Sequence, residues 1–227
     1  MTISELTNTD KKTVRIFIVR HGQTDHNKSK ILQGHLDVPL NETGFEQASK
    51  CGDRFKEVPI DEFLSSDLTR CLQTIKNIKS HHSDEIDYRS TKNLRERAMG
   101  EVEGMYLKDA LEKYGVGFRN LGEKRVDLLN RLWEEWDNII DNAISKDYKN
   151  ILICTHGGVI TNFINHLYSD NNYKLNPNIK AENLKVPFNT SVTVVDINKI
   201  DKTGTIQLFG DTQHLGEQLQ VKEQLLR

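Results

Sequence analysis

Short apolar runs that end in polar residues recur along the chain and predict buried strands. One run, 14–19, is followed by Arg20 and His21, and another, 151–154, is followed by Thr155 and His156. The first run is rich in Ile, Val and Phe and the second in Ile and Leu, as buried strands are. Glycine comes next in each case and allows the backbone to turn sharply. The pattern places a histidine just past the carboxyl end of each strand, where open α/β sheets bind ligands.

Segments with a helical period alternate with the strands and predict amphipathic helices. Their apolar faces consist of Phe45, Ala48, Gly52 and Phe55; of Leu68, Cys71, Leu72, Ile75 and Ile78; of Leu129, Leu132, Trp133, Trp136, Ile140, Ala143 and Ile144; and of Val159, Ile160, Phe163, Ile164 and Leu167. Thr43 and Glu46 have the spacing of a capping box for the first helix. Further strands are predicted at 62–65 and 85–88.

Two other segments complete the expected fold. The apolar runs 191–195 and 205–209 lie too close for a helical crossover, so they should pair as a hairpin at a sheet edge. Periodicity fades over 91–124, which predicts a long irregular segment with one helix near 107–114. The alternation as a whole predicts a three-layer α/β/α sandwich with a mostly parallel central sheet and an antiparallel edge.

Arg70 follows the strand predicted at 62–65 and strengthens the case for a ligand site. With Ser66 as N-cap, Arg70 falls in the first turn of the next helix, where the macrodipole disfavours a cation. A bound anion would remove the conflict. Arg20 and His21 taken alone would favour a strand capped at the surface. Two arginines and two histidines at strand ends together predict a site for a tetrahedral dianion such as phosphate.

Composition limits the classes of partner. The chain has 227 residues, enough for one α/β domain over 1–227, with 1–13 expected to be a flexible leader. A net charge of −2 provides no global basic field, so neither nucleic acid nor a membrane is expected as a partner. The polar start lacks a signal-peptide core, and the longest apolar runs are far shorter than a membrane span.

The cysteines and histidines argue against disulfides and metal. Cys51, Cys71 and Cys154 are scattered and odd in number, which indicates reduced thiols and a cytoplasmic location, with the nucleus left open. His81 and His82 form a pair in a polar loop without the spacing of a metal site. The sequence predicts no metal requirement and no cofactor.

Four motif blocks carry a family resemblance. They are Arg20-His21-Gly22; Ser65-Ser66-Asp67-Leu68 with Arg70 and Gln73-Thr74; Leu94-Arg95-Glu96 with Gly100 and Glu103-Gly104; and Thr155-His156-Gly157-Gly158. In order and spacing they resemble the histidine phosphatase superfamily, whose fold is phosphoglycerate mutase-like. The resemblance extends from about residue 15 to residue 215, and it implies the activity and the roles that follow.

The resemblance implies that His21 is the nucleophile and would form a phosphohistidine. Arg20 and Arg70 would clamp the phosphoryl oxygens, because a planar guanidinium binds two oxygens at once. His156 would donate a further hydrogen bond to the transferring group.

By the same resemblance, the remaining binding positions are Asn27, Gln33, Gly34 and Gly157. Asn27 taken alone is equally consistent with a turn former. His214 matches a C-terminal family element and receives no catalytic role. Lys30 and Arg125 could reach a second substrate phosphate, although charged loop residues are usually only solvated.

Glu96 is the proton donor by the family match. Without that match, a loop carboxylate between Arg95 and Arg97 would be assigned to an ion pair. In the expected cycle Glu96 protonates the leaving alkoxide and then, ionised, activates water to hydrolyse the phosphohistidine.

Within the superfamily the sequence favours a small phosphatase. It resembles fungal broad-specificity phosphatases and fructose-2,6-bisphosphatase-type regulators. The short interval from Glu96 to His156, and Met99 where mutases usually have Tyr, weigh against a mutase. A mutase-type phosphotransferase and an inactive phospho-ligand binding module remain the alternatives. The expected substrate is a small phosphorylated metabolite and the product is inorganic phosphate, while the particular metabolite and the oligomeric state stay open.

Overall fold

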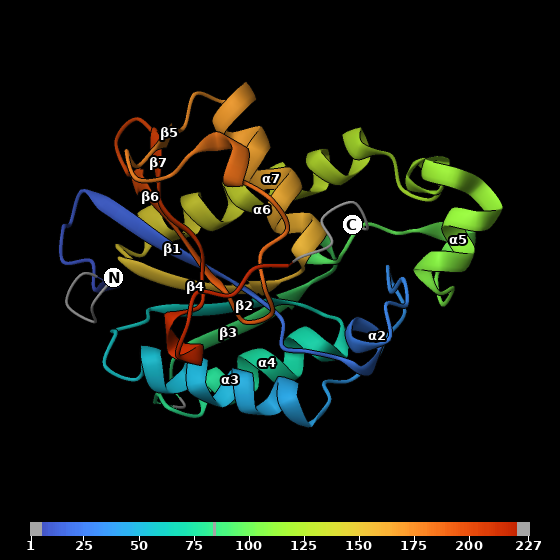
Figure 1. Ribbon diagram of the computed structural model, residues 1–227. Coiled ribbons are helices and arrows are strands. Elements are labelled where there is room, and N and C mark those ends of the chain that lie inside the picture. Colours follow the sequence, from blue (N-terminus) through green and yellow to red (C-terminus); the bar gives the residue numbers. More distant parts are fainter. Residues whose placement is uncertain (1–5, 84, 222–227) are drawn as a thin grey trace.

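The computed structural model describes residues 6–83 and 85–221, which build a mixed sheet covered by helices (Figure 1). Seven strands of these residues lie in the order β3-β2-β4-β1-β6-β7-β5. Their bounds are β1 Thr13–Arg20, β2 Glu62–Ser66, β3 Asp87–Thr91, β4 Asn150–Thr155, β5 Lys174–Leu175, β6 Val192–Asn198 and β7 Gly204–Asp211. β3, β2, β4 and β1 run parallel, whereas β6 is antiparallel to β1 and β7.

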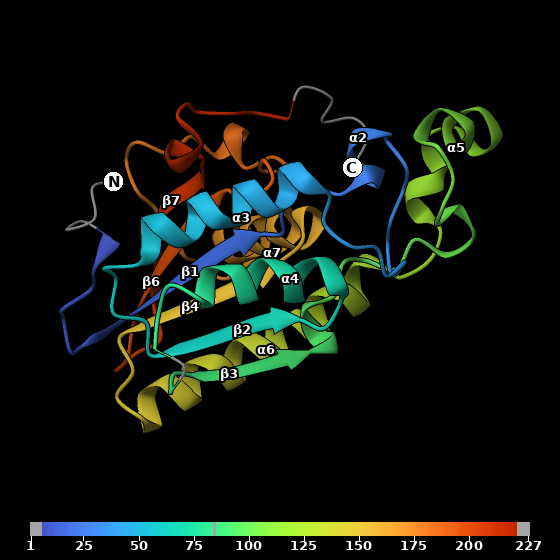
Figure 2. The same cartoon turned by 90° about the horizontal axis from the view of Figure 1, so that it is seen from below.

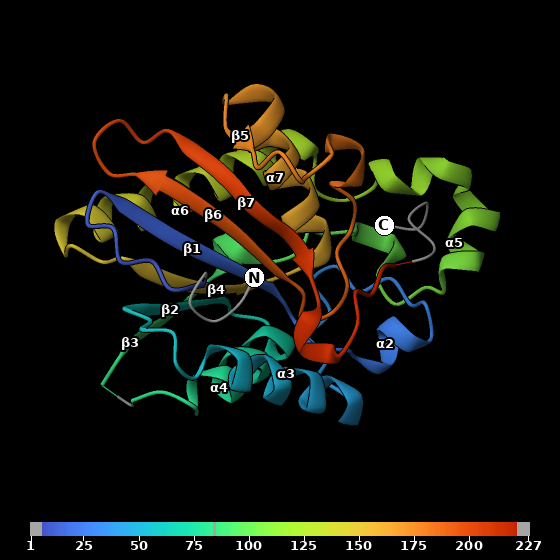
Figure 3. The ribbon, with the colours of Figure 1, turned by 60° about the vertical axis from the view of Figure 1, so that its left-hand side comes forward.

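Helices form one layer on each face of the sheet (Figures 2 and 3). α3 (Glu42–Phe55) and α4 (Thr69–Lys79) cover one face, and α6 (Arg125–Ser145) and α7 (Gly157–Asp170) cover the other. Along β1, Ile16 and Ile18 pack in the cluster with α6 and α7, whereas Phe17 and Val19 pack with α3 and α4. Burial on both faces explains the continuous apolar runs. The predicted three-layer α/β/α fold is confirmed.

Two helices begin at other residues than the sequence predicted. Asn41 is the N-cap of α3, and its Oδ1 accepts from Gly44 N at 2.9 Å, so the capping box expected from Thr43 and Glu46 is wrong. Leu68 is the N-cap of α4, and Ser66 ends β2 instead of capping the helix. Arg70 nevertheless lies in the first turn, as predicted, because α4 begins at Thr69.

Residues 6–13 pack against the body of the protein, in contrast to the flexible leader expected over 1–13. Leu6 is fully buried in the cluster with α3 and α4. Asn8 N donates to Asn150 Oδ1 at 3.1 Å, and Asn150 Nδ2 donates back to Asn8 O at 3.1 Å. Partners so distant in sequence leave no local pattern that would reveal them. Residues 1–5 lie outside the described residues.

The irregular segment and the hairpin have the predicted form. β6 and β7 pair antiparallel, and the short β5 adds one more strand beyond them at the edge. α5 (Leu107–Tyr114) stands away from the sheet (Figure 1). It belongs to a small separate core of Leu32, Val102, Leu107, Ala110 and Phe118. The chain enters and leaves this extension at Gly100 and Gly122, and a Cβ on Gly100 would lie 3.1 Å from Gly122 N.

A buried ion network joins the edge strand β3 to α6. Glu62 is 3% exposed and Glu135 is 4% exposed. Arg89 on β3 donates to Glu62 Oε1 at 3.1 Å and to Glu135 Oε1 at 2.6 Å. Asn142 Nδ2 donates to Glu62 Oε2, and Thr91 Oγ1 donates to Glu135 Oε2. Without Arg89 two carboxylates would be buried with neutral donors only.

We expect Arg89→Met to lower the free energy of unfolding by about 3 kcal/mol, because removing one partner strands the buried charges of the others. Urea unfolding followed by circular dichroism measures the change. Lys202→Met is the control, since Lys202 and Asp141 form an exposed pair that should be worth about 0.5 kcal/mol or less. Equal small losses in both variants would contradict a stabilising role for the buried network.

Candidate active site

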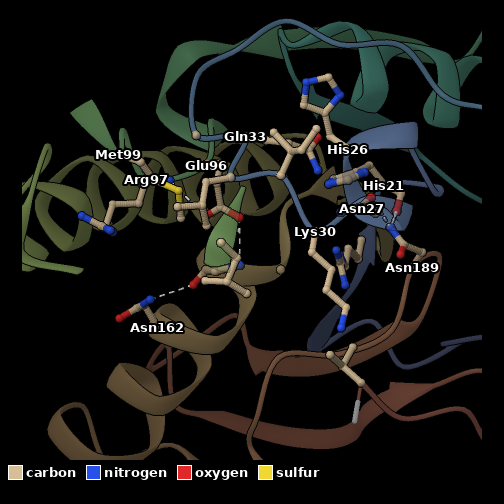
Figure 4. A pocket seen from close by; sticks show the side chains of 18 of the residues that line it. His21, His26, Asn27, Lys30, Gln33, Glu96, Arg97, Met99, Asn162 and Asn189 are labelled. Atoms are coloured by element: carbon tan, nitrogen blue, oxygen red, sulfur yellow. Dashed lines mark hydrogen bonds between the residues drawn. The ribbon is translucent and has the colours of Figure 1, made fainter. Parts of the chain in front are cut away.

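The carboxyl ends of β1, β2 and β4 bring the predicted residues to one pocket of about 940 Å³ (Figure 4). Eight of the nine predicted site residues line it: Arg20, His21, Asn27, Gln33, Gly34, Arg70, Glu96 and Gly157. The ninth, His156, is fully buried beneath this wall. Lys30 and Arg125 also line the pocket, whereas their contact with a second substrate phosphate stays a prediction.

The hydrogen bond of His21 fixes its tautomer. His21 is 3% exposed, and its Nδ1 lies 2.7 Å from Gly22 O. A carbonyl oxygen only accepts, so Nδ1 carries the proton. In the neutral ring Nε2 therefore carries the lone pair. The imidazole at the pocket wall is thus prepared to act as a nucleophile through Nε2.

The turn that carries His21 is packed against the first turn of α3. Gly22 N donates to Thr74 Oγ1 of α4 at 3.0 Å. A Cβ on Gly22 would lie 2.5 Å from Gly44 O, and a Cβ on Gly44 would collide with Gln23 O. Glycine is required at both positions because each backbone approaches the other too closely for a side chain. The imidazole consequently sits on a turn that two helices hold in place.

Arg70 is held by three hydrogen-bond acceptors of the protein. Its Nη1 donates to Leu36 O at 2.7 Å, its Nη2 to Gly34 O at 2.8 Å, and its Nε to His156 Nδ1 at 3.2 Å. Burial lowers the pKa of this guanidinium, an effect that a bound anion would oppose. Of its five N–H groups, these bonds leave two for a ligand.

Arg20 lies against the N-terminus of α7. It is 2% exposed, and its Nη1 donates to Pro187 O at 2.8 Å. A Cβ on Gly157 would lie 3.1 Å from Arg20 Nε, so glycine allows the guanidinium to approach the helix. Two buried cations next to a helix N-terminus favour an anion in the pocket.

His156 uses both ring nitrogens within the protein. Because a guanidinium only donates, Nδ1 accepts from Arg70 and Nε2 donates to Ser66 Oγ at 2.9 Å. Burial, followed by the Arg70 charge, lowers the pKa of His156 well below its usual value and keeps the ring neutral. Its ring centroid lies 5.2 Å from that of His21. In this structure His156 orients Arg70 and packs on His21, and donation to a transferring group stays a prediction.

Glu96 is held at the N-terminus of α7 (Figure 4). Its Oε2 accepts from Gly158 N at 2.9 Å, and its Oε1 accepts from Arg97 N at 3.0 Å. A Cβ on Gly158 would collide with this carboxylate. Neither Arg95 nor Arg97 forms a side-chain ion pair with Glu96 among the described contacts, since Arg95 pairs with Asp67 and Arg97 donates to main-chain carbonyls. The alternative of a loop carboxylate neutralised by a neighbouring arginine is therefore wrong.

Asn27 and Gln33 present their amides to the pocket. Thr24 and Asn27 form a capping box at α2 (Asp25–Lys28), in which Asn27 Oδ1 accepts from Thr24 N at 3.2 Å. Gln33 Oε1 accepts from Thr24 Oγ1 at 3.2 Å. These bonds orient both amides through their oxygens. The NH₂ groups of Asn27 and Gln33 are the donors that an anion in the pocket would use.

Asn189 is a pocket residue that the sequence did not reveal. Its Nδ2 donates to His21 O at 2.9 Å and lies 3.3 Å from Asn27 Oδ1 (Figure 4). Nothing in its immediate sequence distinguishes it from other loop asparagines. Its one signal is position, because it follows the polar stretch 168–187 just before β6.

The described residues contain no group of His, Cys, Asp and Glu side chains that could hold a metal ion. Across 6–83 and 85–221, every helix is too short or too polar to cross a membrane.

Comparisons with known proteins agree on one family. A family model described as "Histidine phosphatase superfamily (branch 1)" matches residues 16–212, a range that contains all four motif blocks. A broad-specificity phosphatase of Saccharomyces cerevisiae is 41% identical over 92% of this chain and 91% of its own. A probable phosphatase of Schizosaccharomyces pombe is 34% identical over 89% and 95%. A phosphoglycerate mutase structure from Bacillus anthracis has the same fold, with a TM-score of 0.76 at 24% identity, over 92% of this chain and 97% of that one.

His214 supports the backbone behind the pocket. Its Nε2 lies 3.2 Å from Thr190 Oγ1, and Thr190 N donates to Arg20 O at 3.0 Å. Burial, followed by the charge of Arg54, lowers the pKa of His214 to about 4, while Asp211 acts in the opposite direction. The folded protein therefore holds His214 neutral at pH values where an exposed histidine is protonated.

This shift predicts a loss of stability on acidification. The unfolded chain takes up a proton at His214 near pH 6.5, whereas the folded chain does so only near pH 4. Stability should therefore be complete above pH 6.5 and fall as the pH drops toward 4, with a slope of up to about one proton.

Urea midpoints measured from pH 7 to pH 4 test this prediction against His214→Gln, which keeps hydrogen-bonding groups but does not titrate. The variant should lose less stability over this interval, by the contribution of one histidine. Parallel pH curves for both proteins would contradict the assigned shift.

Proposed function

The chain belongs to branch 1 of the histidine phosphatase superfamily, and on that premise we propose that it is a metal-independent phosphatase for small phosphomonoesters. The observation that carries the proposal is the fixed tautomer of His21, which leaves the lone pair on Nε2 of a residue that lines the same pocket as two buried arginines. Such a wall neutralises a phosphoryl group and supplies a nucleophile at the same place.

In the first step, His21 Nε2 attacks phosphorus in line with the ester oxygen. The new P–N bond forms as the P–O bond breaks, and Glu96 gives its proton to the departing alkoxide. Arg20 and Arg70 bind the non-bridging oxygens and stabilise their charge. Nδ1 of His21 keeps its proton throughout, and its bond to Gly22 O stabilises the cationic phosphohistidine.

In the second step, the ionised Glu96 takes a proton from water, and the water oxygen attacks phosphorus. The P–N bond breaks, inorganic phosphate leaves, and both His21 and the protonated Glu96 are restored. The bonds from Gly158 N and Arg97 N keep the carboxylate at one position for both proton transfers.

Hydrolysis is favoured over transfer to a second substrate. The two relatives compared above over nine-tenths of their length are both named phosphatases. The similarity to a mutase structure, at 24% identity, concerns the fold alone. The described machinery is also complete, which argues against an inactive binding module.

The pocket indicates the size and charge of the substrate. At about 940 Å³ it exceeds the needs of a phosphate, so the remaining volume is available for the alcohol. We propose a phosphorylated metabolite as substrate and inorganic phosphate as product. The three buried, unbridged cysteines support a reducing compartment such as the cytoplasm. We also propose that residues 1–227 form one domain.

We expect His21→Ala to lose at least about a thousandfold in kcat, because the covalent path needs this imidazole. Hydrolysis of p-nitrophenyl phosphate measures the loss, and an alkaline quench, in which phosphohistidine survives, should detect no phosphoenzyme. His26→Ala is the matched control, since His26 also lines the pocket. Retained turnover in His21→Ala, or an equal loss in His26→Ala, would contradict the assignment.

Glu96→Gln keeps the shape of the side chain but cannot transfer a proton. For an alkyl phosphate, kcat/KM should fall by about a hundred- to ten-thousandfold. The loss should be much smaller for p-nitrophenyl phosphate, whose leaving group needs little protonation. If dephosphorylation limits turnover, rapid quench should also trap phosphohistidine.

The control for Glu96→Gln is Glu101→Gln, because Glu101 is exposed and bonds to Tyr114. An equal loss of activity for both leaving groups, with no trapped intermediate, would make Glu96 a structural or binding residue. Glu101 or Glu103 would then have to be tested as the acid.

A further inference from the structure

Arg131 of α6 gathers the backbone of the segment that carries Glu96. Its Nη1 donates to Asn93 O at 2.6 Å and to Arg95 O at 2.9 Å, and its Nη2 donates to Glu96 O at 3.0 Å. One planar group thus contacts three carbonyls within four consecutive residues. No other side chain of the described residues donates to so many carbonyls of residues 93–96.

Glu123 completes the arrangement from the opposite side. Its two oxygens accept from Arg131 Nε at 2.6 Å and from Arg131 Nη2 at 2.8 Å. Glu123 N donates to Ala98 O at 2.8 Å, and Ala98 N donates to Glu123 Oε2 at 3.3 Å. The Arg131 charge, opposing the effect of burial, holds the pKa of Glu123 below its usual value. The segments that lead into and out of the α5 extension, at 93–98 and at Glu123, are therefore joined through this ion pair.

We infer that Arg131 is a positioning residue for Glu96, an inference that rests on the proposed function. The Glu96 carboxylate accepts from Gly158 N of α7, while its carbonyl accepts from Arg131 of α6 and also from His35 Nε2 at 2.7 Å. Of these two donors to the carbonyl, Arg131 alone also holds Asn93 O and Arg95 O, so it joins the whole 93–96 backbone to α6. Losing Arg131 leaves Glu96 O with the single described bond from His35 and lets the segment shift relative to α7, and a displacement of about 1 Å can cost up to a hundredfold in rate.

If Arg131 only stabilised the fold, its loss would affect good and poor leaving groups equally. Arg15 provides a matched arginine–carboxylate pair for comparison. Arg15 also forms a two-pronged pair with a carboxylate, that of Asp196, and donates to Leu6 O. The side chains are similarly enclosed, at 13% and 15% exposure for Arg15 and Asp196 against 17% and 15% for Arg131 and Glu123. Arg15 lies near the start of β1, at the opposite end of that strand from His21.

The test compares Arg131→Met and Arg15→Met by kcat/KM, which reports the chemistry only through formation of the phosphohistidine. For Arg131→Met we expect a loss of about tenfold or more with an alkyl phosphate and less than about threefold with p-nitrophenyl phosphate. Arg15→Met should change both substrates equally, whatever it does to the melting temperature. Arg131→Lys, which keeps the charge but not the planar fork, should show the same selective loss to a smaller degree.

The double variant Arg131→Met/Glu123→Gln distinguishes a displaced Glu96 from the effect of leaving the Glu123 charge unpaired. It removes the carboxylate stranded by the first substitution, so its melting temperature should recover while the selective loss on alkyl phosphates remains. Recovery of alkyl phosphate activity together with stability would overturn the inference, as would an equal loss on both substrates in the Arg131 variants. In either case the proposed function survives if Glu96→Gln still distinguishes the two leaving groups, and it fails if that variant does not.

Discussion

Burial of positive charge at the ends of two parallel strands is the constraint on which the rest of the structure depends. Arg20 and Arg70 are 2% and 1% exposed, and such charges are costly to remove from water. The surrounding chain offsets that cost with main-chain carbonyls, from Gly34 and Leu36 for Arg70 and from Pro187 for Arg20. Burial, followed by the Arg70 charge, lowers the pKa of His156 and keeps it neutral, which is why it can accept a hydrogen bond from Arg70. The pocket is thus organised for an anion.

Glu96, which we propose as the acid, lies at the N-terminus of α7, the same helix end that Arg20 approaches. Glu96 binds the N-terminus of α7 through Gly158 N, whereas the nucleophile is carried by the turn after β1. The proposed acid and the proposed nucleophile are therefore carried by different segments around one cavity.

The sequence could predict the strands, most helices and the site residues because these depend on local periodicity and on motifs at strand ends. It could not predict which residue caps a helix: Asn41 caps α3 because of the path by which the chain enters, and Ser66 bonds His156 instead of capping α4. It also missed Asn8 and Asn189, whose partners lie 142 and 168 residues away. The contacts of His156 escaped prediction for the same reason, since a motif gives a position and not a hydrogen-bond partner.

The extension that contains α5 forms, together with Leu32, a small core separate from the two main clusters, and its two ends meet at Gly100 and Gly122. Residues added or removed between these glycines would leave Gly100 and Gly122 in contact. The hydrophobic clusters on the two faces of the sheet would also stay unaltered. Part of the pocket wall, including Leu107, Phe118 and Arg119, comes from this extension. Substitutions within the extension can therefore change the shape of the pocket, and with it the substrate preference, during evolution. Arg20, His21 and Arg70 lie outside the extension and need not change.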